Sequence, residues 1–594
     1  MCGIIGYVGK RQAKPILVNA LARLEYRGYD SCGIAVEGSG IKVFKDAVRV
    51  EALKRVLPPL SGMLGIGHTR WATHGKPSLI NAHPHLDCSG KIAVVHNGVI
   101  SNSSGLRNQL TSEGHSFVSE TDTEVIPHLI EKYYRGNLED AVEAALLDVE
   151  GSYAIVVLMA GESRLVAARK DCPLIIGIGD SENFVASDVP AILDYTSRVI
   201  YLEDGDIGVV TEDSIEITRS KTRVNRQEQQ ILWSREDVQK ADYEHFMLKE
   251  INEQPRVMRD SLREHLLSTE PLIDLGLALA PSLKDLLILA CGTSYHAGLI
   301  GRHVIEKLLG IPVKIKPASE FDPCRQITGE TVTLAITQSG ETADVLKAVK
   351  ELKRRGNRVI AITNVPGSTV TRLVDQTIYT RAGPEVSVAA TKTFIAQLMV
   401  LYQLALSHPR VSCGIGERLL VELRQLPAKV EKVLENEWQI VNCARYLSSY
   451  DNVFFIGRGI NLPVALEGAL KLKEISYIHA EGCAAGELKH GAFALLNRDT
   501  PVIPIVTHDN TYGAMLTSIK EVKARSSPVI ALADEADEVT EGLADLVLKV
   551  PSVSAIFSPV VNTVTVQLLA YHTARCRGCS IDFPRNLAKS VTVE

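Results

Sequence analysis

The residues with the clearest chemical potential stand at the start of the sequence, where Cys2 follows Met1 directly. A small side chain at the second position favours removal of the initiator methionine, which leaves a thiol and a free α-amine on one residue. Such an amine has a pKa of about 8 and can therefore take the thiol proton at neutral pH, directly or through a water. Because ionised cysteine is a strong nucleophile, we expect a catalytic Cys2 held by a buried apolar strand at residues 4–8.

Polar stretches further along the chain supply other groups that amide hydrolysis needs. Asn97 and Gly98 follow an apolar run and offer two N–H donors for an oxyanion hole, although a His-Asn-Gly sequence is also typical of a simple turn. Arg70 and Asp122 carry opposite charges that suit the head group of an amino acid. Asp122 is also a candidate helix cap. We expect the strand at 92–98 to run into a loop at Asn97.

Five ordered motifs carry a family resemblance: Met-Cys-Gly-Ile-Ile-Gly, Glu-Tyr-Arg-Gly-Tyr-Asp-Ser, His-Thr-Arg-Trp-Ala-Thr-His-Gly, Val-His-Asn-Gly and Ser-Glu-Thr-Asp-Thr-Glu. They resemble the glutaminase domain of the class II glutamine amidotransferases. The resemblance implies an N-terminal-nucleophile hydrolase fold, an α/β/β/α sandwich, over residues 2–218. It implies that Cys2 is the nucleophile, Asn97 and Gly98 the oxyanion donors and Trp71 the gate for ammonia. The residues that it assigns to glutamine binding are Arg70, Thr73, His74 and Asp122.

Composition narrows the possible partners. The chain has 594 residues, which is too long for one hydrophobic core and suggests roughly three to five domains. A net charge of -6 provides no basic field, so we do not expect a nucleic-acid partner. The sequence contains no apolar run long enough for a membrane span, and we interpret residues 393–407 as a buried helix. Eleven scattered cysteines favour a reducing cytoplasm, and the Cys576 and Cys579 spacing predicts no metal site by itself.

The rest of the chain predicts a duplicated α/β architecture. Residues 219–243 are strongly charged and mark a linker, after which a helix begins near residue 243. Apolar strands at 285–290, 333–337 and 358–363 recur at 452–457, 502–506 and 528–533. Such β-α-β alternation predicts two doubly wound parallel sheets. We place the domains at 244–415 and 416–580, with a tail at 581–594.

A hydroxyl-rich loop is expected at the carboxyl end of one of these strands. Residues 337–342 read Thr-Gln-Ser-Gly-Glu-Thr and precede a helix, so their hydroxyl and N–H groups suit a phosphate ester. A second such loop is expected at residues 291–294. Both halves resemble the sugar isomerase (SIS) domain. Thr337 replaces a serine of many relatives but keeps the hydroxyl, whereas Ala390 replaces a serine of some members and removes one potential sugar contact.

Charged residues gather late in the chain. Glu467, Lys471 and Glu474 can share one helix face, which is either an ordinary solvated face or a site where a carboxylate moves a proton between sugar carbons. Lys589 lies in the tail, where a lysine is usually exposed to solvent. An amine beside a ketose can instead form a Schiff base.

The order of a glutaminase domain, two SIS domains and this tail resembles the glutamine-dependent aminotransferases of sugar phosphates. By that resemblance the substrates are glutamine and fructose 6-phosphate, the product is glucosamine 6-phosphate, and the enzyme is a homodimer. Lys589 forms the imine, Glu474 moves the proton, His490 assists ring opening and Lys471 supports the site. No metal or organic cofactor is expected, because the imine activates the carbonyl. The expected sugar-phosphate contacts are Ser294, Thr337, Gln338, Ser339, Thr342, Val388, Lys471 and Ala588.

Three alternatives remain open from the sequence. A phosphoribosylamine-forming amidotransferase would need an acidic, metal-binding site for phosphoribosyl diphosphate, and two SIS repeats are the wrong acceptor for it. A regulator that only binds sugar phosphates would tolerate the loss of Cys2 and Lys589. A related enzyme could act on a different ketose phosphate.

Overall fold

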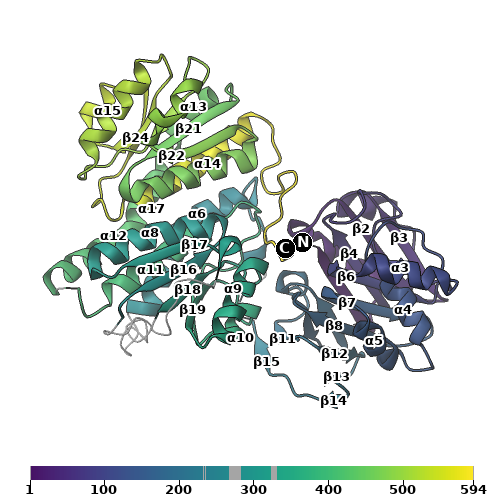
Figure 1. Cartoon of the computed structure of the whole chain (residues 1–594). Coiled ribbons are helices and arrows are strands. Elements are labelled where there is room, and N and C mark those ends of the chain that lie inside the picture. The colour runs from purple at the N-terminus through teal and green to yellow at the C-terminus, as the bar shows by residue number, and fades with distance from the viewer. Residues whose placement is uncertain are drawn as a thin grey trace. The chain divides into compact units, whose positions relative to one another are not determined.

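The computed structural model describes residues 2–231, 233–234, 236–266, 283–322, 331–411 and 413–592 (Figure 1). Met1, whose removal we expect, and the last two residues of the tail lie outside the described residues. The chain divides into two compact units. Unit 1 comprises Met1–Val238 and Ala588–Glu594, and unit 2 comprises Gln239–Leu587.

Unit 1 is built on two antiparallel sheets. The first has the order β15-β11-β9-β10-β1-β4-β2-β3, and the second has the order β14-β13-β12-β8-β7-β6-β5. The strands of the first sheet are β1 (Gly3–Gly9), β2 (Ser31–Glu37), β3 (Ile41–Asp46), β4 (Leu64–Arg70), β9 (Ile175–Ile178), β10 (Glu182–Ala186), β11 (Arg198–Tyr201) and β15 (Glu228–Gln230). The strands of the second are β5 (His85–Leu86), β6 (Ile92–Ile100), β7 (Gly151–Met159), β8 (Leu165–Lys170), β12 (Asp206–Val210), β13 (Ile215–Arg219) and β14 (Thr222–Arg223).

Three apolar cores separate the layers of unit 1. Ile4 and Ile66 of the first sheet share a core with Val95 and Val156 of the second, so the sheets pack face to face. The outer face of the first sheet packs on α1 (Ala13–Ala22) and α2 (Val50–Val56). The outer face of the second packs on α3 (Ser103–Ser112), α4 (Val125–Tyr133) and α5 (Leu138–Leu147). This order of layers confirms the predicted α/β/β/α sandwich.

Part of the predicted linker takes part in these sheets. β14 pairs with β13, and β15 pairs with β11 across Arg198 and Gln230. Charged residues suit such short edge strands, because one side of each remains open to water.

Unit 2 contains two parallel sheets with the same strand order. The first runs β17-β16-β18-β19-β20, with β16 (Leu286–Ala290), β17 (Val313–Pro317), β18 (Val332–Ile336), β19 (Arg358–Thr363) and β20 (Gln376–Tyr379). The second has β21 (Asn452–Gly457), β22 (His479–Ala484), β23 (Val502–Pro504), β24 (Ile530–Asp534) and β25 (Leu546–Val550). Its ladders β22-β21-β23 and β24-β25 are joined by parallel bridges at Val502 and Ile505. The predicted doubly wound duplication is confirmed.

One continuous apolar core joins the two halves of unit 2. It contains Ile288 and Leu401 from the first half together with Phe455 and Val564 from the second. Every residue of α11 (Lys392–Leu406) is buried, which confirms the predicted buried helix. In the described part of unit 2, the α-helices are α6 (Phe246–Leu266), α8 (Gly292–Leu309), α9 (Ala343–Arg354), α10 (Thr369–Leu373), α11 (Lys392–Leu406), α12 (Cys413–Glu435), α13 (Glu437–Leu447), α14 (Leu462–Ser476), α15 (Tyr512–Lys523), α16 (Glu538–Glu541) and α17 (Ser558–Cys576).

Among the described residues, no helix combines the length and the apolar character that crossing a bilayer requires.

Candidate functional site

Cys2 lies directly before β1, and its sulfur faces the residue that follows β4. The Trp71 N–H donates to Cys2 Sγ at 3.3 Å, and the thiol lies 3.6 Å from the Trp71 carbonyl oxygen. β1 and β4 pair from Gly3 with Thr69 to Val8 with Leu64, so this register brings the two segments together. A wholly buried strand therefore holds the predicted nucleophile in place, while Cys2 itself stays half-buried.

Asn97 is positioned against the nucleophile by a buried histidine. Its Nδ2 donates to the Cys2 carbonyl oxygen at 2.9 Å. His68 Nε2 lies 3.0 Å from the His96 carbonyl oxygen and 3.1 Å from Asn97 Oδ1, which are both acceptors, so this nitrogen carries the proton. Burial lowers the pKa of His68 to about 3 and keeps its ring neutral. The His68 contact thus orients the Asn97 amide with its N–H groups toward Cys2.

The expected loop at Asn97 is wrong, because β6 continues through this residue to Ile100. Asn97 and Gly98 pair with Ala154 and Tyr153 of β7. Gly98 has a φ of +133°, and a Cβ there would lie 2.0 Å from the Ser152 carbonyl oxygen. The strand therefore passes the site without a turn, and only glycine fits at this point.

Arg70 and Asp122 take up the charged positions of the site. Arg70 Nη2 donates to the carbonyl oxygens of His74 and Gly75, whereas its buried Nη1 finds no hydrogen-bond partner in the described part of the chain. Burial lowers the pKa of Arg70, and the nearby Cys2, Asp122 and Asp30 charges oppose that shift. Asp122 accepts a 2.8 Å bond from the Ile100 N–H, so it anchors the end of β6 and does not cap α4.

The other predicted glutamine-site residues lie in the loop after β4. Trp71 is half-buried, and Thr73 and His74 are exposed. The His74 carbonyl oxygen, and not its ring, contacts Arg70.

Two contacts of this site were missed from the sequence. Arg27 Nε donates to the Cys2 carbonyl oxygen at 3.2 Å, and Arg27 Nη1 forms a 2.6 Å ion pair with Asp188. Arg27 lies within a motif that the sequence singled out, which was a usable signal. Asp188 lay outside every motif, and only the fold brings it to Arg27.

The predicted phosphate loop lies where the first parallel sheet reverses its strand order. Residues 337–342 follow β18 and precede α9, while residues 291–294 follow the neighbouring β16. Open α/β sheets bind ligands at this crevice. Thr337 Oγ1 lies 3.1 Å from Thr342 Oγ1 and accepts the Gly340 N–H at 3.2 Å, and Ser339 Oγ accepts the Glu341 N–H at 3.1 Å. Gln338 is half-buried beside them.

The second expected loop is shorter than predicted. Gly292 already begins α8, so Thr293 and Ser294 lie in its first turn. Ser294 is buried, and its hydroxyl oxygen accepts a 3.0 Å bond from Gln397 of α11.

Gly340 shapes the 337–342 loop. Its φ is +67°, and a Cβ would lie 2.0 Å from Ser368 Oγ. The Gly340 carbonyl oxygen accepts the Val370 N–H at 3.0 Å, and Glu341 accepts the Thr369 N–H at 2.7 Å. The loop is therefore pressed against residues 368–370 and has little freedom to change shape.

Glu467, Lys471 and Glu474 share one face of α14, as predicted, but this face is not solvated. Lys471 Nζ lies 3.5 Å from Glu467 and 2.5 Å from Glu474, and both Lys471 and Glu467 are buried. Burial alone would lower the pKa of Lys471, but the two carboxylates raise it. Burial alone would raise the pKa of Glu467, but Lys471 and His296 lower it. The net shift of each pKa therefore favours the charged form of the side chain.

This charged group contacts the first half of unit 2. Glu467 accepts from Thr293 Oγ1 at 3.1 Å and pairs with His296 Nδ1 at 2.7 Å, while Lys471 donates to Thr293 Oγ1 at 3.1 Å. The start of α8, beside the phosphate crevice, is thus bound to the charged face of α14.

The remaining predicted residues lie in several places. His490 is exposed and ends a short 3-10 turn, Glu487–His490. Val388 is buried, and its N–H donates to the Asp582 carbonyl oxygen at 3.1 Å. Ala588 and Lys589 are half-buried and belong to unit 1, where the Lys589 N–H donates to the Tyr26 carbonyl oxygen at 3.4 Å.

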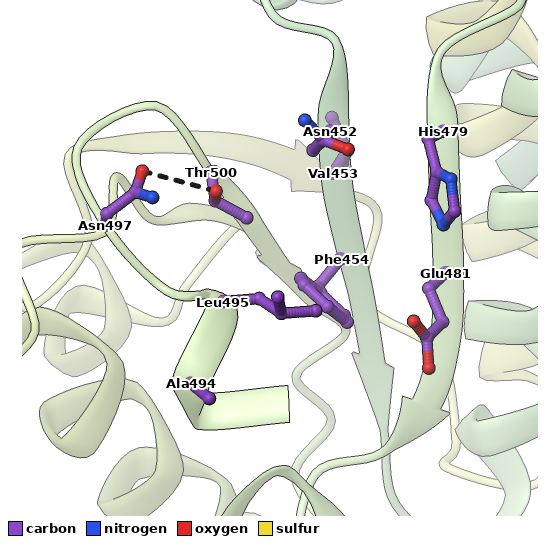
Figure 2. A pocket seen from close by; sticks show the side chains of 9 residues that line it. All are labelled: Asn452, Val453, Phe454, His479, Glu481, Ala494, Leu495, Asn497 and Thr500. Atoms are coloured by element: carbon purple, nitrogen blue, oxygen red, sulfur yellow. Dashed lines mark hydrogen bonds between the residues drawn. The ribbon is translucent and has the colours of Figure 1, made fainter. Parts of the chain in front are cut away.

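A separate pocket of about 430 Å³ lies beside the amino ends of β21 and β22 in the second sheet (Figure 2). His479 and Glu481 of β22 face it, together with Asn452 and Phe454 of β21 and the 494–500 segment. Asn497 Oδ1 accepts from Thr500 Oγ1 at 3.3 Å in this segment. None of the predicted site residues lines this pocket, and it adjoins the amino ends of the strands, where parallel sheets do not usually bind substrates.

Comparison with known families finds matches in both units. Residues 282–407 and 446–575 match the SIS domain, and residues 69–194 match a glutamine amidotransferase domain.

Several curated proteins match the whole chain. The glutamine–fructose-6-phosphate aminotransferase (isomerizing) of Caldanaerobacter subterraneus subsp. tengcongensis is 47% identical over 608 residues, and that of Methanosarcina acetivorans is 48% identical over 620 residues. Both matches cover 100% of each chain. A solved C-terminal domain of glucosamine-fructose-6-phosphate aminotransferase from Francisella tularensis is 36% identical, with a TM-score of 0.55, and covers 58% of this chain and 100% of that one.

Replacing His68 should disturb the Asn97 amide without removing it. We expect His68→Phe to lower kcat for amide hydrolysis by roughly 10- to 100-fold with little change in KM, because the predicted oxyanion donor Asn97 loses its orientation and not its place. Steady-state release of the hydrolysis product measures this. An unchanged kcat would show that Asn97 needs no help from His68.

Gly340→Ala should distort the 337–342 loop. The strain of about 1–3 kcal/mol should weaken binding of a phosphate ester by roughly 10- to 100-fold. Gly356→Ala is a matched control, because Gly356 also has a positive φ of +78° but has open space around its Cβ position. Equal affinities of the two variants, measured by titration calorimetry, would contradict the proposed fit.

Lys471→Met should leave two adjacent carboxylates without a cation. We expect a loss of about 3–5 kcal/mol in stability, seen as a lower urea midpoint for unit 2. Lys473→Met, on the exposed face of the same helix, should have little effect. Adding Glu467→Gln to Lys471→Met should restore part of the loss, and a loss no larger than that of the control would refute the role of the buried lysine.

Proposed function

Because the chain belongs to the family of isomerizing glutamine–fructose-6-phosphate aminotransferases, we infer that it transfers the amide nitrogen of glutamine to fructose 6-phosphate and isomerises the product to glucosamine 6-phosphate, releasing glutamate. The chain is an enzyme with a glutaminase unit and two sugar-phosphate-binding halves.

In unit 1, Cys2 attacks the side-chain amide carbonyl of glutamine. Its own α-amine takes the thiol proton after Met1 is removed, and returns a proton to the departing ammonia. Asn97 Nδ2 and the Gly98 N–H stabilise the oxyanion. Arg70 binds the α-carboxylate and Asp122 the α-amine of glutamine, with Thr73 and His74 at the edge of the site. Water then releases glutamate from Cys2, and Trp71 controls the exit of ammonia.

The observation that most directly supports this assignment is the buried Nη1 of Arg70. A guanidinium donor without a partner among the described residues is costly to bury, and a carboxylate ligand would satisfy it. It belongs to the residue that immediately precedes Trp71, whose N–H contacts the Cys2 sulfur.

The second reaction takes place on fructose 6-phosphate. Its phosphate binds to Ser294, Thr337, Gln338, Ser339 and Thr342. The sugar contacts Val388 and Ala588. Lys589 adds to the C2 carbonyl and expels water to form an imine, which ammonia then displaces. Glu474 moves the proton between C1 and C2. The ion pair of Glu474 with Lys471 supports this role, because Lys471 also contacts Thr293 at the start of α8 and so holds the carboxylate near the phosphate loop.

We also propose that the enzyme acts as a homodimer in the cytoplasm. His490 assists ring opening, and its exposure in a single chain suits a residue that completes the site of a partner subunit. Cys2, Cys32, Cys88, Cys291, Cys443, Cys483, Cys576 and Cys579 form no disulfide bond, which agrees with a reducing compartment.

The alternative substrate is a different ketose phosphate, and residues of the sugar-binding loops leave this alternative untested. Thr337 retains the hydroxyl of the phosphate loop, but Ala390 lacks one, so a sugar with a different hydroxyl pattern could be accepted. Incubation with glutamine and a panel of ketose phosphates, followed by identification of the amino sugar, distinguishes these substrates.

Two variants should distinguish glutamine hydrolysis from amino-sugar formation. Cys2→Ala should abolish glutamate release and amino-sugar formation. Lys589→Arg should retain glutamate release but lose amino-sugar formation and the covalent adduct that borohydride traps from the imine. Lys473→Arg is the control and should still be trapped at Lys589. Near-normal synthesis by Cys2→Ala would refute the nucleophile, and trapping at another lysine in Lys589→Arg would refute the imine-forming residue.

A further inference from the structure

A cluster of metal-ligand side chains lies in unit 1 apart from the residues that act on glutamine. It comprises Cys88, His115, His128 and Glu131, whose ligand atoms all lie within 4.8 Å of one another. Cys88 lies between β5 and β6, and His115 lies between α3 and α4. His128 and Glu131 are three residues apart on α4 and therefore share one face of that helix.

Two distances within the cluster match the edges of a tetrahedron around one ion, and two lie a few tenths of an ångström or less outside that range. Cys88 Sγ lies 3.6 Å from His115 Nδ1 and 3.5 Å from His128 Nδ1. Glu131 Oε2 lies 3.0 Å from His115 Nδ1 and 3.7 Å from His128 Nδ1. Zinc bonds of about 2.3 Å to sulfur and about 2.0–2.1 Å to nitrogen or oxygen at tetrahedral angles give edges of about 3.3–3.6 Å.

Hydrogen bonding within the protein accounts for only part of this arrangement. The His115 and Glu131 pair is an ordinary contact, and Cys88 Sγ accepts the Ser116 N–H at 3.4 Å. His128, however, is buried, and its Nδ1 faces both the Cys88 thiol at 3.5 Å and the Glu131 carboxylate at 3.7 Å. One ring nitrogen can bond only one of the two directly, whereas an ion between the four side chains would contact them all.

A carboxylate also lies near the far side of the His128 ring. Nε2 of His128 is buried, finds no hydrogen-bond partner among the residues described, and faces Glu124 Oε1 at 3.9 Å. In metal sites, a hydrogen bond from the outer ring nitrogen to a carboxylate fixes the tautomer and increases the basicity of the nitrogen that binds the metal, and Glu124 is placed to accept such a bond after a small shift.

We propose that Cys88, His115, His128 and Glu131 bind one Zn²⁺ ion in a structural site. One thiolate and two imidazoles favour zinc over magnesium or calcium, which prefer oxygen ligands. Four protein ligands complete a tetrahedral shell and leave no open position for substrate or water, which is typical of structural and not of catalytic zinc. The sequence led us to expect no metal, because the imine activates the carbonyl of the sugar. The proposed zinc is structural and takes no part in that reaction.

The ion joins three segments that lead to the glutamine site. Cys88 precedes β6, which carries Asn97 and Gly98. His115 precedes the 118–124 turn, where Glu124 accepts the N–H groups of Val118 and Ser119 at 2.8 and 2.7 Å. Asp122 lies in this turn and is bound to the end of β6. Zinc binding therefore holds the oxyanion donors and Asp122 in one arrangement, and only this consequence rests on the proposed function.

Metal analysis of the full chain tests the site itself. We expect about one zinc per chain after purification without chelator, and a similar content in Cys576→Ser, which removes another exposed cysteine. Cys88→Ser and Glu131→Gln should lose most of the zinc. Replacement by Co²⁺ should give a thiolate-to-cobalt charge-transfer band and tetrahedral d–d bands. Both should be lost in Cys88→Ser and in Glu131→Gln, and both should be kept in Cys576→Ser. Absence of zinc and of these bands in the unchanged chain, or equal zinc in Cys88→Ser and Cys576→Ser, would overturn the proposal.

A second measurement separates the site from its effect on catalysis. Removal of zinc by a chelator should lower the melting temperature of the unchanged chain and slow glutamate release, and added Zn²⁺ should reverse both. Glu131→Gln should show the lower melting temperature without further response to the chelator. If chelation changes the melting temperature but not the rate of glutamate release, the zinc site stands and its link to glutamine hydrolysis fails.

Discussion

The arrangement of unit 2 depends on a lysine ammonium buried between two carboxylates. Lys471 lies between Glu467 and Glu474 on α14, and Glu467 in turn holds Thr293 and His296 of α8. Burying each charge costs several kcal/mol, so the group is stable only when every member is in place. This requirement fixes the second half of unit 2 against the start of α8 in the first half. The helix that carries Glu474 is therefore tied to the helix that begins beside the phosphate crevice.

A comparable network operates in unit 1 around the Cys2 carbonyl oxygen. Asn97 and Arg27 both donate to it, and each is held by a further contact, with His68 and Asp188 respectively. Tyr26, the neighbour of Arg27, accepts the N–H of Lys589 from the tail. The backbone of the proposed imine-forming residue is thus connected through two adjacent residues to the proposed nucleophile, and both belong to unit 1.

The duplicated sheets of unit 2 differ at their equivalent crevices. In the first half, the loops after β16 and β18 carry hydroxyl and N–H groups around Gly340. In the second half, Asn461 after β21 binds Thr507 and Ser558 at 2.8 and 3.0 Å and is buried. Its side chain is already bonded within the protein, whereas the equivalent loops of the first half carry the predicted phosphate contacts.

The sequence by itself determined the layers, the duplication and most of the chemical groups. Alternation of apolar strands with helices is a local signal, so the strands at 286–290, 332–336 and 358–363 and their repeats were predicted closely. Cys2, Arg70, Asp122 and the 337–342 loop stood out because their residue types and order are unusual for structural positions. The face shared by Glu467, Lys471 and Glu474 followed from helical spacing alone.

Tertiary structure decided the properties that depend on distant partners. β6 continues through Asn97 because β7, more than fifty residues later, supplies its hydrogen bonds. The charged face of α14 is buried because α8 covers it, which no spacing within α14 reveals. The contacts of His68, Asp188 and the Cys88 cluster could not be predicted, because each joins segments that are far apart in the chain. Burial and long-range contact set the protonation and orientation of these groups, and neither is encoded in local sequence.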